Sequence, residues 1–181
     1  MRIISGKARG KKLISPKDQQ VRPTSDRVKE AIFSSIHDKI FNSTFLDLFC
    51  GSGQIGIEAL SRGAKFCTFV DSSKESIDLT KKNLDSLKGI VGYQTIHKQV
   101  KDALEGFASD SFDIIFLDPP YNSIEIDKIL DIIATKGILK NKGIIIIEKG
   151  VSTPLSVPDV LIVQKTKKYA DTNIVILEVA P

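Results

Sequence analysis

The chain has 181 residues, 41% of them apolar, which suffices for one sizeable core but not for two ordinary domains. Its apolar runs are far shorter than the roughly 20 residues that cross a bilayer, and it has no pattern of a secretory signal. Its two cysteines form no disulfide framework. We therefore expect a cytoplasmic protein without a structural metal. The net charge of +4 is concentrated in residues 1–30, where nine Lys or Arg meet three Asp or Glu, which suggests an anionic partner such as nucleic acid or, alternatively, only a solvated surface.

The first 40 residues are predicted to form a basic arm and one helix. Short apolar stretches at 2–5 and 11–14 flank a glycine-bounded turn, which favours a hairpin or extended arm. Thr24 or Ser25 is a suitable helix cap, and apolar residues then recur at helical spacing to about residue 39. We expect residues 1–40 to pack on a core domain of residues 41–181.

From residue 45 onward, strand patterns alternate with helix patterns. Strands are predicted at 45–49, 66–71, 93–97, 112–117, 143–148, 160–166 and 174–179. Helices are predicted at 55–62, 74–87, 101–107 and 124–133. Alternation implies a mostly parallel α/β sheet, and the last two strands, with no helix between them, should form an antiparallel edge hairpin. Seven strands ending in a reversed hairpin indicate the Rossmann-like class I fold of S-adenosylmethionine-dependent methyltransferases.

A glycine-rich loop lies where the first buried strand of this pattern meets a helix. Gly51, Gly53 and Gly56 let a ligand approach the backbone, and the helix start offers free N–H groups. Asp71 ends the next strand, where a carboxylate can accept both ribose hydroxyls of an adenosine. The glycine spacing alone also fits a dinucleotide.

Asp47 favours S-adenosylmethionine over a dinucleotide, because a carboxylate is a poor neighbour for a pyrophosphate and a good one for an ammonium and a sulfonium. Cys50 could be imagined as a nucleophile, but it is better explained as a small residue lining the loop. The predicted cofactor-binding residues are Asp47, Phe49, Cys50, Gly51, Ser52, Gly53, Asp71, Ser72, Gln99, Val100 and Asp118.

The predicted catalytic turn is Asp118, Pro119, Pro120 and Tyr121, directly after the strand at 112–117. The exocyclic amine of a base is a poor nucleophile, because its lone pair is delocalised into the ring. Hydrogen bonds from this amine to the Asp118 carboxylate and the Pro119 carbonyl would aim the lone pair at the methyl group. Tyr121 offers a stacking face for the base, and proline presents the carbonyls rigidly.

The chain resembles the RsmD family of bacterial 16S rRNA guanine-N2 methyltransferases almost from end to end. The stretches that carry the resemblance are 2–6 with 9–13, 22–33, 46–53, 58–64, 118–121 and 168–172. Of these, the Arg-Pro-Thr stretch from Arg22 and the Glu-Ala-Leu-Ser-Arg-Gly run from Glu58 are the more specific.

The resemblance implies a guanine of small-subunit rRNA as substrate, in a partly assembled ribosomal particle, with the N-terminal region as the RNA contact. The expected contacts are Arg9, Lys11, Lys12, Arg22, Thr24 and Arg27. Two positions depart from the family pattern: Val100, preceded by Gln99, stands where relatives often carry Asp or Asn near the adenine, and Ala170 replaces a glycine. We expect a monomer.

Three other functions remain open from the sequence. One is an amino-methyltransferase acting on DNA adenine or cytosine, or on a protein glutamine. The second is a nicotinamide-dependent oxidoreductase that uses the glycine loop. The third is a catalytically silent RNA-binding assembly factor, against which the intact Asp118 turn argues.

Overall fold

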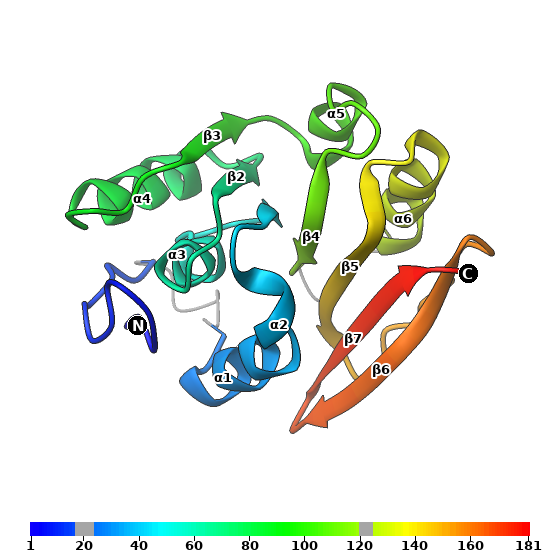
Figure 1. Cartoon of the computed structure of the whole chain (residues 1–181), viewed down its shortest axis with the longest axis horizontal. Coiled ribbons are helices and arrows are strands. Elements are labelled where there is room, and N and C mark those ends of the chain that lie inside the picture. The colour runs from blue at the N-terminus through cyan, green and yellow to red at the C-terminus, as the bar shows by residue number, and fades with distance from the viewer. Residues whose placement is uncertain (17–23, 120–124) are drawn as a thin grey trace.

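Seven strands form one sheet with helices on both faces (Figure 1). The computed structural model describes residues 1–16, 24–119 and 125–181. The strands are β1 (Thr44–Leu48), β2 (Phe66–Asp71), β3 (Tyr93–His97), β4 (Phe112–Leu117), β5 (Leu139–Gly150), β6 (Leu161–Tyr169) and β7 (Thr172–Val179). Their order is β3-β2-β1-β4-β5-β7-β6, in which β1 to β5 pair parallel and β7 is antiparallel to both of its neighbours. The predicted parallel sheet with a reversed edge hairpin is confirmed.

Six helices are present in the described residues, and the first predicted helix is divided in two. The helices are α1 (Asp26–Ser35), α2 (His37–Ile40), α3 (Gln54–Ser61), α4 (Lys74–Asp85), α5 (Val100–Glu105) and α6 (Glu125–Lys136). The prediction of one helix to residue 39 was wrong, because Ile36 leaves the helical conformation at φ −121°. Both halves still bury their apolar side chains, so the apolar spacing did not reveal the break. Ser25 is confirmed as the cap of α1, where its hydroxyl accepts from the Val28 N–H. No helix in the described ranges is long and apolar enough to cross a membrane.

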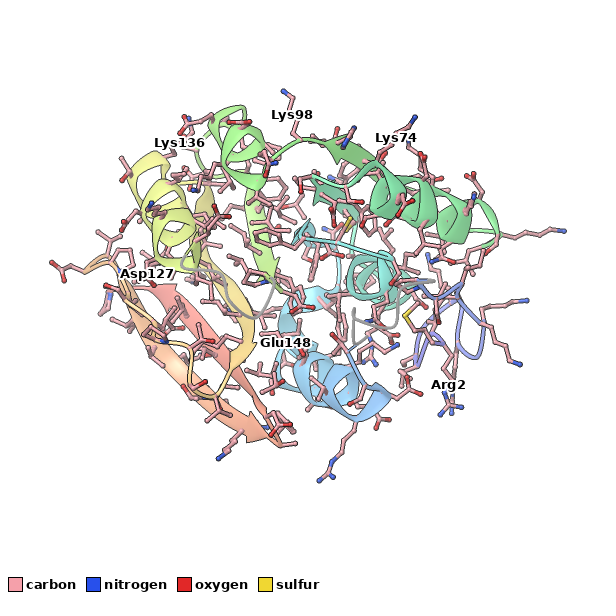
Figure 2. The ribbon with its side chains drawn as sticks, turned by 180° about the vertical axis from the view of Figure 1, so that it is seen from behind. Arg2, Lys74, Lys98, Asp127, Lys136 and Glu148 are labelled. Atoms are coloured by element: carbon pink, nitrogen blue, oxygen red, sulfur yellow. The ribbon has the colours of Figure 1, made fainter. Side chains whose placement is uncertain are left out.

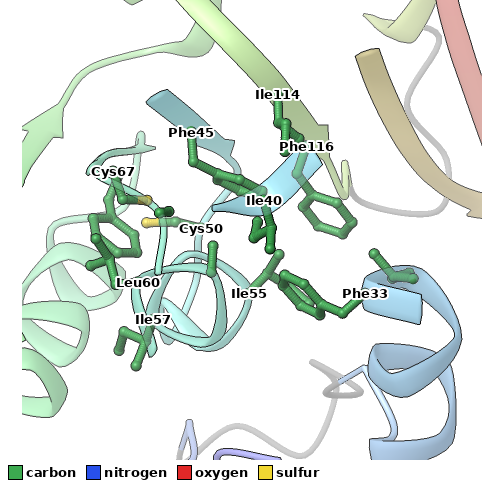
Figure 3. Close-up of a cluster of buried hydrophobic side chains, with 14 of the residues drawn as sticks. Phe33, Ile40, Phe45, Cys50, Ile55, Ile57, Leu60, Cys67, Ile114 and Phe116 are labelled. Carbon is green, nitrogen blue, oxygen red and sulfur yellow. The ribbon is translucent and has the colours of Figure 1, made fainter. Parts of the chain in front are cut away.

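Two apolar clusters lie on opposite faces of the sheet. One packs α1 to α4 and the N-terminal arm, and Figure 3 shows Phe33, Phe45 and Phe116 meeting in it. The other packs α5 and α6. Along Ile144–Ile147 in β5, side chains alternate between the two clusters and are at most 1% exposed. Only a strand covered on both faces explains so continuous an apolar run.

The N-terminal arm docks on the carboxyl end of α3. It forms a single antiparallel bridge between Arg2 and Lys12, and the backbone N–H groups of Ile4 and Ser5 donate to the Glu58 carboxylate at 2.8 and 3.0 Å. The Ser61 hydroxyl donates to the Ser5 carbonyl at 2.6 Å. Two separate stretches that carry the family resemblance, one in the arm and one in α3, are therefore bound to each other. The domain boundary between residues 40 and 41 stays a prediction.

Gly6 allows this docking, and we expect alanine there to destabilise the protein. A Cβ on Gly6 would lie 1.8 Å from the Ser61 carbonyl oxygen, and its φ is +85°. Gly10 is the matched control, because its φ is +82° and a Cβ there would meet nothing within 4 Å. Both substitutions incur the left-handed penalty of roughly 1–2 kcal/mol. We expect Gly6→Ala to cost about 1–3 kcal/mol more by overpacking, measured by urea unfolding. Equal losses for the two variants would show that the arm does not need this close approach.

Candidate functional site

Four carboxylate residues stand in a row at the carboxyl edge of the parallel strands. Asp71 ends β2, Asp47 lies in β1, Asp118 directly follows β4 and Glu148 lies near the end of β5. Leu117 and Ile147 are paired in the register, so Asp118 and Glu148 occupy neighbouring positions. Because successive strand residues point to opposite faces, all four lie on the face covered by α1 and α3.

The row crosses the point where the topology of the sheet reverses. The chain runs outward from β1 to β2 and β3 and then returns to place β4 on the other side of β1. Open α/β sheets bind their ligands in the crevice at such a point. The glycine loop after β1 and the turn after β4 flank it.

Hydrogen bonds hold the glycine loop against the end of β2. The Gly51 N–H donates to Asp71 Oδ2 at 2.9 Å, and the Ser73 N–H donates to Asp71 Oδ1 at 2.8 Å. Each oxygen therefore keeps a free lone pair that can accept a ribose hydroxyl. Phe49 and Gly53 both have positive φ, +61° and +75°. These conformations turn the chain sharply from β1 into α3.

Two buried polar residues of α4 support the loop, and the sequence did not reveal them. The Thr80 hydroxyl donates to the Gly51 carbonyl at 3.0 Å, and the Asn83 amide donates to the Ser52 carbonyl at 2.9 Å. Asn83 also exchanges hydrogen bonds with the backbone of Ile14, which links the arm to the loop. Both residues are fully buried on the apolar face of α4. Polar residues at buried helical positions are the signal that could have identified them.

Burial raises the pKa values of the inner carboxyls in the row. Asp47 is 1% exposed and, among the described residues, accepts one hydrogen bond, from the Gly56 N–H; burial raises its pKa to about 7. Burial, and then the neighbouring Glu148 and Asp47 charges, raise the pKa of Asp118 well above its usual value. Burial also raises the pKa of Glu148, partly offset by the hydrogen bond from Thr24. None of the four acids forms an ion pair with another described residue. Such a group of acids favours a cationic ligand.

The thiol of Cys50 is poorly suited to nucleophilic attack. It lies in the apolar cluster with Cys67 (Figure 3), 3.6 Å from the Thr80 hydroxyl. Burial and the charges of Asp47 and Asp71 raise its pKa well above the usual value. The thiolate is thus disfavoured, in keeping with a role in lining the loop.

The remaining predicted cofactor-binding residues follow β2 and β3, with Gln99 and Val100, the two predicted near the adenine, after β3. The Ser72 carbonyl is 3.0 Å from the His97 ring nitrogen Nε2. Gln99 is exposed and caps α5, and Val100 is buried as the first residue of that helix. A first helical residue has an N–H without an intrahelical partner, which suits an adenine ring nitrogen. The roles of these residues stay predictions.

Part of the predicted catalytic turn lies in the described residues. Asp118 is half-buried and Pro119 is buried, directly beyond β4. Pro120 and Tyr121 lie outside the described residues. Ala170, the departure in the last hairpin, has a φ of +48°, so this turn takes a left-handed conformation without a glycine.

The residues predicted to contact RNA differ in exposure to solvent. Arg9, Lys11, Lys12 and Arg27 are exposed, and Arg22 lies outside the described residues. Thr24 is different, since it is 7% exposed and its hydroxyl donates to Glu148 Oε2 at 2.8 Å. This bond connects Thr24 to the row of acids, and its contact with RNA stays a prediction.

An open pocket of about 310 Å³ adjoins the row at Glu148. It lies between the start of α1 and the β6–β7 turn. Its lining includes Thr24, Arg27, Glu148, Lys168 and Tyr169. Its lining therefore contains the Glu148 carboxylate, the aromatic ring of Tyr169 and two cations, Arg27 and Lys168.

The fold defines the class of protein as an S-adenosylmethionine-dependent methyltransferase. The structure superposes with a TM-score of 0.88 on the candidate methyltransferase yhhF of Escherichia coli, at 28% identity over 99% of this chain and 97% of that one. A candidate methylase of Haemophilus influenzae, HI0767, gives a TM-score of 0.83 at 32% identity, over 99% and 98% of the two chains.

The sequence places the chain in one family of this class. The family model described as "Conserved hypothetical protein 95" matches residues 1–178. Ribosomal RNA small subunit methyltransferase D of Haemophilus influenzae is 37% identical over 88% of this chain and 83% of its own length, and that of Escherichia coli is 32% identical over 86% and 77%. The chain belongs to this family, the RsmD family, which confirms the resemblance drawn from its motifs.

Proposed function

We propose that the protein transfers a methyl group from S-adenosylmethionine to the exocyclic N2 of a guanine in 16S rRNA. The observation that carries this proposal is the row of four acids, which joins the glycine loop to the Asp118-Pro119 turn and forms no ion pair with another described residue. Relatives named for methylation of small-subunit rRNA support the substrate.

The residues of the site fit this cofactor. The Asp71 oxygens can hold the ribose. The buried Asp47 and the half-buried Asp118 can stabilise positive charge, whereas a pyrophosphate would be repelled by them. A solved methyltransferase of related fold was crystallised with S-adenosylhomocysteine, at a TM-score of 0.64 and 16% identity. When bound, the cofactor supplies an electrophilic methyl group on sulfur.

The chain's own residues position the amine. The Asp118 carboxylate and the Pro119 carbonyl accept its two N–H bonds, which localises the lone pair on N2. A strong base is not needed, since positioning and exclusion of water provide much of the acceleration. The proton released after transfer is accepted by the carboxylate of Asp118.

The basic arm and α1 would hold the RNA through Arg9, Lys11, Lys12 and Arg27, with Arg22 beside them in the chain. We further propose that the protein acts as a monomer, in the cytoplasm, on a partly assembled small-subunit particle.

The test is transfer of labelled methyl from S-adenosylmethionine to four acceptors: partly assembled small subunits, isolated 16S rRNA, DNA and a glutamine-containing protein mixture. We expect label in the first acceptor and less in isolated 16S rRNA. Label confined to DNA or protein would overturn the substrate, and tighter binding of NAD than of S-adenosylmethionine would overturn the cofactor.

Cofactor affinity should rise with pH up to about 7. Asp47 is protonated below its raised pKa of about 7 in the free protein, and a bound cation favours the ionised form, so binding releases a proton. Below pH 7, each decrease of one pH unit should weaken cofactor binding by up to about tenfold. Calorimetry in buffers of different ionisation enthalpy measures this release, and Asp47→Asn should reduce it. A wild-type affinity that is flat between pH 5.5 and 7.5 would contradict the proposed role of Asp47.

A further inference from the structure

We propose that Glu148 selects guanine at this site, by accepting the N1–H bond of the base while Asp118 and Pro119 accept the N2 hydrogens. This inference deepens the proposed function and rests on it. It assigns a specificity role to a residue outside the glycine loop and the Asp118 turn.

The position of Glu148 fits a residue that touches the base. It lies in the strand next to Asp118, one register position beyond the pair Leu117 and Ile147, and on the same face of the sheet. Figure 2 shows Glu148 in the middle of the molecule, and its hydrogen bond to Thr24 places it beside the start of α1. Glu148 lines the pocket, and its charge raises the pKa of the neighbouring Asp118.

Glu148 forms one hydrogen bond with the described residues. Its Oε2 accepts from the Thr24 hydroxyl at 2.8 Å, and its Oε1 has no hydrogen bond to another described residue. Glu148 is only 6% exposed and forms no ion pair with a described residue, so its burial carries a desolvation cost. A buried carboxylate that lines a pocket, with one oxygen held by Thr24 and the other without a described partner, is suited to receive an N–H donor.

The pattern of donors on guanine matches the acceptors of the site. The edge next to the target amine presents one N1–H and two N2–H bonds, and this site presents two carboxylates and the Pro119 carbonyl. Adenine has an unprotonated N1 beside its amine, and the lone pair of that N1 would face the Glu148 carboxylate. Glu148 therefore favours guanine over adenine in two ways, by accepting the N1–H of guanine and by repelling the N1 lone pair of adenine.

The rest of the pocket suits a nucleotide. Tyr169 is half-buried in the wall and can stack on a base. Arg27 and Lys168 are exposed at the rim, where they can hold the phosphates of the flanking nucleotides. A cavity of about 310 Å³ accommodates a purine.

The test replaces the target guanine by 2-aminopurine, which keeps the amine at C2 but has an unprotonated N1. The modified guanine is first located in small subunits. Ligated 16S rRNA with guanine or 2-aminopurine at that position is then assembled into particles and methylated. Wild-type protein should prefer guanine by about 10- to 100-fold in kcat/KM, and Glu148→Gln should lower kcat/KM for guanine and reduce the preference below about fivefold.

Two further variants separate specificity from folding. Thr24→Val leaves the carboxylate but removes the bond that fixes it, so it should retain the preference with a higher KM. Glu105→Gln, on an exposed pair with Lys136, should behave as wild type. If wild type methylates guanine and Glu148→Gln keeps the full preference, the role of Glu148 is overturned while the proposed function stands. If wild type methylates no guanine, the proposed function itself has failed.

Discussion

Asp118→Ala is expected to lower the rate of methyl transfer to small subunits by about 10²- to 10³-fold, the loss typical when one positioned hydrogen-bonding group is removed from a transition state. Asp118 is the carboxylate nearest the reacting amine in the proposed arrangement, and alanine leaves only the Pro119 carbonyl as acceptor. The glycine loop and Asp71 are unchanged, so S-adenosylmethionine should bind within about tenfold of the wild-type affinity. Single-turnover kinetics and calorimetry measure the two quantities.

Asp118→Asn is the informative companion to this variant. Its amide oxygen can still accept one N–H bond, so it should retain more activity than alanine. The Asp118→Asn variant should also change the pH dependence of the rate, because it removes a carboxyl group whose pKa is raised in the wild type. A small loss of rate for both variants would show that Asp118 does not position the amine.

Glu58→Ala is expected to have the largest effect on stability. Glu58 is fully buried and accepts from Ile4, Ser5 and the Arg62 side chain, the last at 2.7 Å. It also lies 3.9 Å from the ammonium of Lys29, which is itself 0% exposed. Removing one partner from a buried charge pair costs roughly 3–5 kcal/mol. For a chain of this length that corresponds to a fall in Tm of roughly 6–20 °C.

The matched control is Glu105→Ala, which breaks an ion pair of 3.3 Å with Lys136 at an exposed position. Exposed pairs contribute about 0–1 kcal/mol, so its Tm should hardly change. Hydrogen exchange should also show the amides of Ile4 and Ser5 losing protection in Glu58→Ala and not in the control. Equal Tm losses would mean that the arm is not anchored by Glu58.

The strands β2, β3 and β4 were predicted with the bounds that the structure shows. β2 and β4 are mostly apolar and buried, whereas β3 mixes apolar and polar residues directly after Gly92. β5 was predicted at 143–148 and extends over Leu139–Gly150. Its first residue, Leu139, pairs with Phe112, and the polar residues 140–142 that follow lie at a register shift before Ile114 pairs with Ile144. Pairing of this kind depends on the neighbouring strand and leaves no pattern in the chain itself.

The site was predictable where its residues are close in sequence. The glycine loop and Asp118 belong to short motifs at the ends of strands, so periodicity placed them together. Thr24 and Glu148 are 124 residues apart and meet only in the folded chain. Glu58 and Arg62 are four residues apart, a spacing that favours the ion pair seen in the structure, whereas the hydrogen bonds of Glu58 to the arm span more than 50 residues and leave no local pattern. An acid directly after four isoleucines in a buried strand was the available signal for Glu148.

The most direct test of the central claim is the identity of the methylated nucleoside. Small subunits from a strain lacking its own enzyme would be incubated with the protein and S-adenosylmethionine, and the digested RNA analysed by mass spectrometry. We expect N2-methylguanosine with the wild-type protein and, over the same incubation, hardly any with Asp118→Ala. A different methylated nucleoside, or none from a protein that binds the cofactor, would contradict it.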